Sequence, residues 1–251
     1  TWVHWPAKNS MEQYGAVQRA PIFSRQFILN RCNENVYRTF HLLLSKNGEK
    51  NGEKNDLKLM VSHDRACFYR PTIGVPGVDA SVSAQFRTKL NVHLDMNPWN
   101  WMESDGRVEE DALSQLTYGG SRLNEFIFEN NQVFRNTSNK NKNENVQLQG
   151  GVNLLDNWAE DGGFLVVPHF HKIYDRYFTQ VKPDGDRSKA SYGFGDNDPV
   201  LKYAQRVCMR AGSMVVWGQY MPHGSAPNYS DRPRSAQFIK MFPTTMIERQ
   251  P

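Results

Sequence analysis

The sequence predicts a mainly β fold of the α+β kind, in which strands form a barrel around a polar site and helices flank the barrel. Residues 86–95 alternate as a strand does: one face carries Leu90, Val92 and Leu94, and the other carries Lys89, Asn91, His93 and Asp95. An apolar back with a polar front is typical of the inner wall of such a barrel. The 251 residues suffice for one domain of this size.

A helix and two short strands are expected before this first polar strand. Apolar residues over 34–45 return to one side at helical spacing, which predicts a helix. Residues 57–62 and 65–70 are typical of short strands, and Pro98 ends the strand at 86–95 because proline has no N–H to donate to a sheet. The apolar side of the helix comprises Val36, Phe40 and either Leu43 or Leu44.

The second half of the chain is predicted to supply the remaining strands of the barrel. Residues 206–210, 213–218 and 235–242 are typical of strands, and a helical stretch is expected near 120–132. Residues 173–200 have no clean period, and a loop of this length in a compact fold is usually functional. We expect this segment to act as a lid over the site; within it, the residues expected to close over the site are Tyr192 and Phe194.

Two Asn- and Lys-rich tracts interrupt the chain, at 46–56 and at 136–145. Neither contains an apolar residue to bury, so both are interpreted as surface inserts. Motifs on both sides of the second tract belong to one site, as described below. The sequence therefore predicts a single domain over residues 1–251.

Two histidines and one aspartate form the candidate site. His93 and Asp95, at positions i and i+2 of a strand, point the same way and can chelate one ion. His223 follows the predicted strand 213–218 after a turn, and Gly224 is expected to let the backbone come close to the metal. Two imidazoles and one carboxylate on one face of a metal form the facial triad of non-haem Fe(II) oxygenases.

Two longer motifs make this pattern more specific. HGSAPNYSDRPRSA (223–236) and GGVNLLDNWAEDGGFLVVPHFHK (150–172) resemble the motifs of the phytanoyl-CoA dioxygenase family. The chain keeps the acidic Gly162-Gly163 turn and His171-Lys172, but has His169-Phe170 where the family usually has Gly-Ser. The resemblance extends over roughly residues 60–243.

The resemblance implies a double-stranded β-helix, a jelly-roll or cupin-like barrel, that uses Fe(II) and 2-oxoglutarate. By this resemblance His93, Asp95 and His223 are the iron ligands, Arg234 holds the distal carboxylate of 2-oxoglutarate, and Ser225 assists it. A planar guanidinium suits a carboxylate because it can donate two parallel hydrogen bonds.

Arg232 competes with Arg234 for the role of carboxylate anchor. The two arginines are two positions apart and could share a face of one strand, so alternation does not separate them. Only the resemblance favours Arg234.

The expected reaction is hydroxylation of a small organic molecule by O₂, with 2-oxoglutarate converted to succinate and CO₂. Halogenating relatives lack the ligand carboxylate, so Asp95 favours hydroxylation. The same site could instead perform desaturation, ring closure or epimerisation. A further alternative is a catalytically silent barrel that binds a ligand, but buried polar ligands are costly to keep without a use.

Other histidines and tryptophans were weighed against the site. His169 and His171, with Asp175, could mimic the His–any–His centre of a cupin, but the Glu of that pattern is missing at its usual offset. Trp99 has equal claims to a pocket lining and to packing, and Trp217 is expected in the core.

Bulk properties exclude several classes of protein. The net charge of +4 is spread along the chain, unlike the basic stripe of a nucleic-acid binder, and no apolar run is long enough to cross a bilayer. Three widely spaced cysteines argue against a disulfide framework and favour a cytoplasmic or other reducing intracellular compartment. The sequons at Asn136 and Asn228 are interpreted as chance matches.

Overall fold

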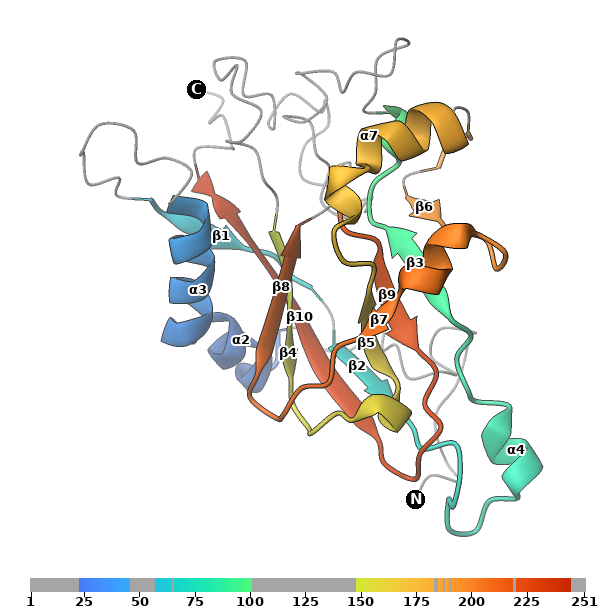
Figure 1. Ribbon diagram of the computed structural model, residues 1–251. Coiled ribbons are helices and arrows are strands. Elements are labelled where there is room, and N and C mark those ends of the chain that lie inside the picture. The colour runs from blue at the N-terminus through green and yellow to red at the C-terminus, as the bar shows by residue number, and fades with distance from the viewer. Residues whose placement is uncertain are drawn as a thin grey trace.

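Two antiparallel sheets face each other and carry helices on their outer sides (Figure 1). The computed structural model describes residues 23–45, 57–64, 66–100, 148–182, 185–186, 188–189, 191–218 and 220–244. Within these residues the fold is a double-stranded β-helix, as predicted. The inserts at 46–56 and 136–145 and the expected helix near 120–132 lie outside the described residues.

The larger sheet, here the major sheet, has strand order β1-β10-β4-β8, with β2 also paired to β10. Four of its five strands match the predicted strands at 57–62, 65–70, 213–218 and 235–242, and β4 has no counterpart among them. Its strands are β1 (Leu59–Val61), β2 (Ala66–Tyr69), β4 (Leu148–Asn153), β8 (Met214–Gly218) and β10 (Arg234–Pro243).

The smaller sheet, here the minor sheet, has strand order β6-β3-β9-β5-β7. The strand expected over 86–95 is shorter in the structure, and the strand expected over 206–210 is reduced to Gln205–Arg206, followed by an isolated bridge at Met209. Its strands are β3 (Asn91–Leu94), β5 (Gly163–Val166), β6 (Tyr192–Gly193), β7 (Gln205–Arg206) and β9 (His223–Ala226).

The pairing of β3 with β9 requires a glycine at position 224. Gly224 lies opposite Val92, and a Cβ atom added to it would come within 1.5 Å of the Asn91 carbonyl oxygen. Gly224 was expected to let the backbone come close to the metal, whereas the close approach in the structure is to the backbone of Asn91. The close neighbour is the adjacent strand, which carries His93.

Two helices, α2 (Arg25–Arg31) and α3 (Glu34–Ser45), cover the outer face of the major sheet. The side chain of Asn33 accepts from the backbone N–H of Val36 and so satisfies a donor at the start of α3. Phe40 is fully buried and packs with Val36 against Ile239 of β10. Of the two alternatives for the end of the apolar side, Leu44 packs on this cluster and Leu43 is exposed.

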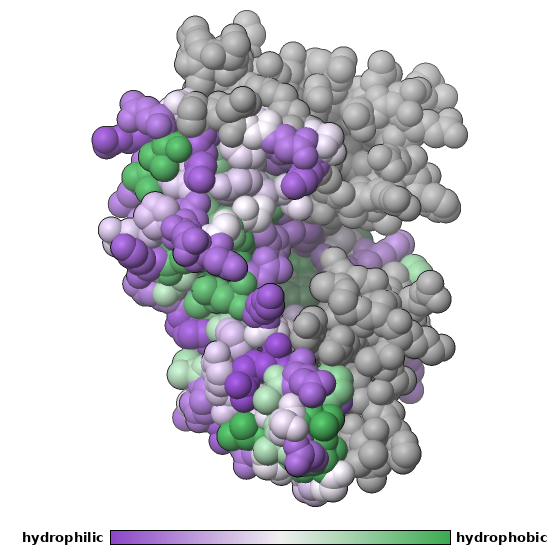
Figure 2. Space-filling model, turned by 90° about the vertical axis from the view of Figure 1, so that its right-hand side faces the viewer, coloured by the Kyte–Doolittle hydropathy of each residue, from purple (hydrophilic) through white to green (hydrophobic). Residues whose placement is uncertain are grey.

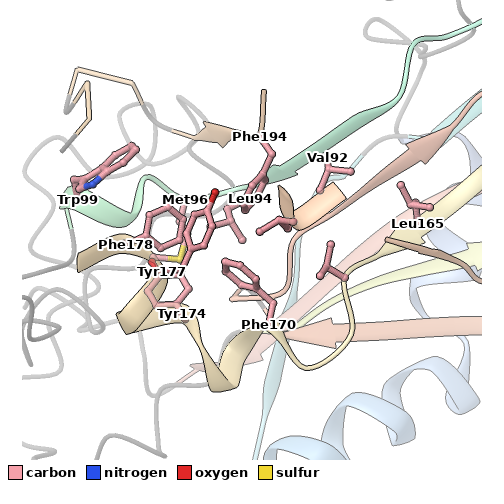
Figure 3. Close-up of a cluster of buried hydrophobic side chains, with 12 residues drawn as sticks. Val92, Leu94, Met96, Trp99, Leu165, Phe170, Tyr174, Tyr177, Phe178 and Phe194 are labelled. Atoms are coloured by element: carbon pink, nitrogen blue, oxygen red, sulfur yellow. The ribbon is translucent and has the colours of Figure 1, made fainter. Parts of the chain in front are cut away.

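An aromatic cluster covers the outer face of the minor sheet (Figure 3). Short helical segments deliver it: η6 (Phe170–Lys172), α7 (Tyr174–Arg176), η7 (Tyr177–Val181) and η8 (Pro199–Tyr203). Val92 and Leu94 of β3 point into this cluster, which confirms two of the three residues of the predicted apolar face. The third, Leu90, lies before β3 and is exposed.

The segment 173–200 therefore contributes to the core. Phe194 is buried in the aromatic cluster, and Tyr192, which lies opposite Leu94 in the β3–β6 pair, packs against it. Both side chains lie on the Leu94 face of β3, away from His93. The expectation that Tyr192 and Phe194 close over the site is wrong, because the alternation of the sheet directs them to its outer face.

Three further short elements connect the sheets: α4 (Ala80–Ala84), η2 (Pro98–Asn100) and η5 (Ala159–Asp161). The three cysteines are free thiols. No described helix has the length and apolar character needed to cross a membrane. On the face in Figure 2, hydrophilic side chains predominate among the described residues, and the hydrophobic ones form separate small groups.

Candidate metal centre

His93, Asp95 and His223 converge between the two sheets. The register of β3 with β9 places His93 directly opposite His223, with ring centroids 4.7 Å apart. Asp95 lies just beyond the end of β3, with Oδ1 3.4 Å from Nε2 of His93 and Oδ2 3.7 Å from Nε2 of His223. One ligand atom from each residue lies within 4.8 Å of the others. Nitrogen and oxygen ligands sit about 2 Å from a first-row ion, so one ion can reach all three.

The position of His223 in the fold differs from the one expected from the sequence. His223 is the first residue of β9 and therefore part of the sheet, where the sequence indicated a residue at the end of a turn. His93 and His223 are held by a hydrogen-bonded ladder, which makes the site a rigid one.

The protonation of these groups fits a divalent metal. His223 Nδ1 lies 3.0 Å from the carbonyl oxygen of Met221, so Nδ1–H donates and Nε2 keeps its lone pair. Burial, helped by His93, lowers the pKa of His223 to about 4. Burial raises the pKa of Asp95, but the hydrogen bond from His93 and the charge of Lys240 together hold it well below its usual range. A neutral imidazole and an ionised carboxylate are the forms that bind metals.

Arg234 and Arg232 lie in different environments. Arg234 is buried at the start of β10, where its Nη1 donates to Ser225 Oγ at 3.0 Å. Its Nε has no hydrogen-bond partner among the described residues. Arg232 is exposed and forms ion pairs with Glu160 at 2.6 Å and with Asp161 at 2.7 Å. The guanidinium of Arg232 is therefore already matched by carboxylates, whereas that of Arg234 is not.

The acidic Gly-Gly turn creates the space that Arg234 occupies. Gly163 has a φ of 112°, and a Cβ atom on it would lie 3.0 Å from Arg234 Nε and 2.4 Å from Asn157 Oδ1. Arg206 lies nearby, but its guanidinium donates to the carbonyl oxygens of Phe164 and Gly162. Arg206 therefore holds the turn together, and Arg234 faces the interior.

Aromatic side chains surround His223. The ring of Trp217 lies 4.9 Å from that of His223 and 4.5 Å from that of Phe164. Trp217 is buried, as predicted, but it also contacts the site. Trp99 packs edge-on against Phe178 and Tyr192, which settles its role in favour of packing.

Two residues of the site were not anticipated from the sequence. Gln149 of β4 donates from Nε2 to Asp95 Oδ2, and Lys240 Nζ lies 3.7 Å from the same oxygen. Strand alternation gives only a weak sequence signal for these two residues. It places Gln149 on the face of its strand opposite to that of Leu148 and Val152, and it places Lys240 on the same face of its strand as Arg234.

The rival histidine pair is not assembled into a metal centre. His169 and His171 are exposed, and their ring centroids are 6.4 Å apart. Among the described residues, the triad is the one group of histidine, cysteine and carboxylate side chains close enough to share an ion. The alternative of a cupin-like centre is not supported.

Comparison with known proteins agrees with this site. Residues 131–236 match the family described as Phytanoyl-CoA dioxygenase (PhyH). A Dictyostelium discoideum protein described as "Putative phytanoyl-CoA dioxygenase" is 48% identical over 239 residues, or 95% of this chain. Over these spans the chain is similar to the phytanoyl-CoA dioxygenase family. It spans 60% of the length of the Dictyostelium protein.

The family match covers only part of the candidate site, and the likeness to a solved structure concerns the fold. The matched residues include His223, Ser225 and Arg234, whereas His93 and Asp95 precede them. The crystal structure of GlcNAc Inducible Gene 2 (GIG2) from Candida albicans has a TM-score of 0.54 at 18% identity, covering 88% of this chain and 52% of that chain. That likeness supports the double-stranded β-helix fold.

Proposed function

We propose that this protein is an Fe(II)- and 2-oxoglutarate-dependent oxygenase that hydroxylates a small organic molecule. In this proposal His93, Asp95 and His223 hold the iron, and Arg234 with Ser225 holds the distal carboxylate of 2-oxoglutarate. When bound, iron and 2-oxoglutarate supply the O₂ chemistry that releases succinate and CO₂ and oxidises the substrate.

The observation that carries this proposal is the buried, unpaired guanidinium of Arg234. No carboxylate lies within ion-pairing distance of it among the described residues. A buried charge without a counter-ion is costly, so an anionic ligand is expected there. Arg232 has three carboxylate partners within 4 Å and therefore lacks this need.

The distance along β9 suits a dicarboxylate that reaches both groups. Ser225 is two residues after His223, so both side chains lie on one face of the strand about 6.6 Å apart. A five-carbon dicarboxylate is of similar length. Its keto acid end can therefore lie at the metal while its other carboxylate accepts hydrogen bonds from Arg234 and Ser225.

The chain's own residues position and shield these groups. The β3–β9 ladder fixes the two imidazoles, and the buried rings of Phe164 and Trp217 exclude water from one side of His223. Exclusion of water strengthens the attraction between Arg234 and an anion. Asp95 completes the ligand set, which favours hydroxylation over halogenation.

The test is metal-dependent formation of succinate from 2-oxoglutarate in the purified protein. We expect slow succinate release with Fe(II), and no release from His93→Ala or Asp95→Ala, which also bind the metal more weakly. His171→Ala is the matched control, because this exposed histidine lies outside the triad, and it should behave as the wild type. Absence of succinate across a broad substrate panel, with no visible absorption change when Fe(II) and 2-oxoglutarate are mixed with the protein without oxygen, would favour a silent ligand-binding barrel.

Desaturation, ring closure and epimerisation remain alternatives at the same site. Each depends on which substrate carbon lies nearest the metal. The mass of the product separates hydroxylation, which adds one oxygen atom, from epimerisation, which leaves the mass unchanged, and from desaturation and ring closure, which both remove two hydrogen atoms. An NMR spectrum of the product then distinguishes a new double bond from a new ring.

A further inference from the structure

A row of three polar side chains crosses the major sheet and faces Asp95. Lys240 of β10 lies opposite Gln149 of β4, and Gln149 lies opposite Trp217 of β8. Residues opposite one another in a sheet project from the same face. This row, Lys240–Gln149–Trp217, therefore reaches across the barrel to a ligand carried by the minor sheet.

Trp217 determines which way the amide of Gln149 points. The indole Nε1–H can only donate, and it donates to Gln149 Oε1 at 2.8 Å. The oxygen of the amide is thereby committed to Trp217, so the NH₂ group faces Asp95 and donates to its Oδ2. A reversed amide would place two donors against each other at Trp217 and two acceptors against each other at Asp95.

Both contacts from the row fall on the same oxygen of Asp95. Gln149 donates to Oδ2, and the ammonium of Lys240 lies 3.7 Å from Oδ2. Oδ1 lies 3.4 Å from His93 Nε2, and Oδ2 lies 3.7 Å from His223 Nε2. Both oxygens therefore face the ligand nitrogens, but only Oδ2 has contacts from the major sheet. Oδ1 is thus the oxygen that these contacts leave available to a metal.

We infer that Gln149, oriented by Trp217 and assisted by Lys240, is a positioning residue that makes Asp95 bind the metal through Oδ1 alone. The inference rests on the proposed function. A carboxylate bound through both oxygens would occupy a second coordination position. A facial triad must leave three positions open, two for the keto acid and one for O₂. The row keeps that third position open.

The test uses Gln149→Leu, which keeps the approximate volume of the side chain and removes its amide. Loss of a hydrogen bond to a metal ligand typically weakens metal affinity about 10- to 100-fold, and we expect a loss in this range for Co(II) measured by titration. At saturating Co(II), the visible spectrum should also change, because it reports the number of coordinated atoms. Trp217→Phe keeps an aromatic ring but removes the N–H that orients the amide, along with part of the ring area beside His223, and should shift both readouts in the same direction by less.

Gln237→Leu is the matched control. Gln237 is a fully buried glutamine on β10 whose side chain bonds to Asn30 and Phe27 on the helical side of the sheet. Its loss should lower the melting temperature while leaving Co(II) affinity and the spectrum at saturation unchanged. A general effect of losing a buried amide would appear in both glutamine variants.

The outcomes separate this inference from the proposed function. Suppose that the wild type forms no succinate and that any Co(II) binding it shows is unaffected by His223→Ala. The proposed function and the positioning role of Gln149 are then both overturned. If the wild type binds Co(II) and forms succinate, but Gln149→Leu and Trp217→Phe keep wild-type affinity and spectrum, the positioning role alone is overturned. Trp217→Phe keeps the test decisive if Gln149→Leu fails to fold.

Discussion

The backbone of Gly163 lies against the guanidinium of Arg234, at the place where the two sheets approach each other. A Cβ atom at position 163 would be 3.0 Å from Arg234 Nε. The glycine also has a φ of 112°, which other residues rarely adopt. The acidic Gly-Gly turn of the family motif thus has a physical purpose here, because it makes room for a buried cation.

Gly163→Ala should destabilise the protein and weaken 2-oxoglutarate binding together. The strained backbone alone costs about 1–3 kcal/mol, and the added methyl group would displace Asn157 or Arg234. Thermal melting and titration with 2-oxoglutarate measure the two effects. Gly195→Ala is the control, since a Cβ atom there meets no atom within 4 Å. Unchanged affinity in Gly163→Ala would contradict the role given to this contact.

Arg234→Gln should raise the dissociation constant for 2-oxoglutarate by about 10- to 100-fold. Hydrogen bonds to charged groups contribute about 1.5–3 kcal/mol, and each 1.4 kcal/mol corresponds to a factor of about ten. Arg232→Gln should change the constant by less than about threefold, because the guanidinium of Arg232 is already engaged by Glu160 and Asp161 and is not available to the ligand. Equilibrium titration of both variants decides between the arginines, and the reverse ranking would move the anchor to Arg232.

The metal-free protein should lose stability as the pH falls from 7 to 5, partly through His223. The pKa of His223 is lowered from 6.5 to about 4 in the folded state. The unfolded chain therefore binds the proton first. The stabilising contribution is present above pH 6.5 and is lost as the pH falls towards 4. We expect His223 to account for about 2 kcal/mol of the change between pH 7 and pH 5.

Urea unfolding of wild type and His223→Gln at both pH values measures this contribution. The variant should show a smaller loss on acidification, because its other titrating groups are unchanged. Equal losses in the two proteins would mean that His223 is accessible to protons in the folded state.

Phe40→Ala should destabilise the fold without affecting the metal centre. Phe40 is fully buried between α3 and the outer face of the major sheet, and truncation of a buried phenylalanine costs about 3–5 kcal/mol. Co(II) affinity of the folded protein should be unchanged, because this face points away from Asp95. Leu42→Ala on the same helix is the control, since Leu42 is exposed. Weakened Co(II) binding in Phe40→Ala would indicate that the two faces of the sheet are coupled.

The metal centre could be predicted because its signals are local or carried by distinctive residues. His93 and Asp95 are two positions apart on an alternating strand, and His223 begins a motif with few chance matches. The supporting row could not be predicted in the same way. Gln149 and Lys240 meet Asp95 through the register of β4 with β10 and through the spacing of two sheets. Both are non-local properties that no short pattern encodes.

The core position of Tyr192 and Phe194 in the segment 173–200 was not predicted for a different reason. The helical turns of this segment are too short to produce a clean period, and polar residues and glycines are frequent between them. Yet Phe170, Tyr174, Tyr177 and Phe178 follow the i, i+4, i+7, i+8 spacing of one helical face, and all four are buried. This spacing of aromatic residues is the sequence signal from which the core packing could have been predicted.

The pairing of His93 with His223 has a consequence for the order of events in folding. The two histidines are far apart in the sequence, so a long loop must close before their strands can pair, and such long-range pairing slows folding. An ion that needs both imidazoles can therefore be captured only after β3 and β9 have come together.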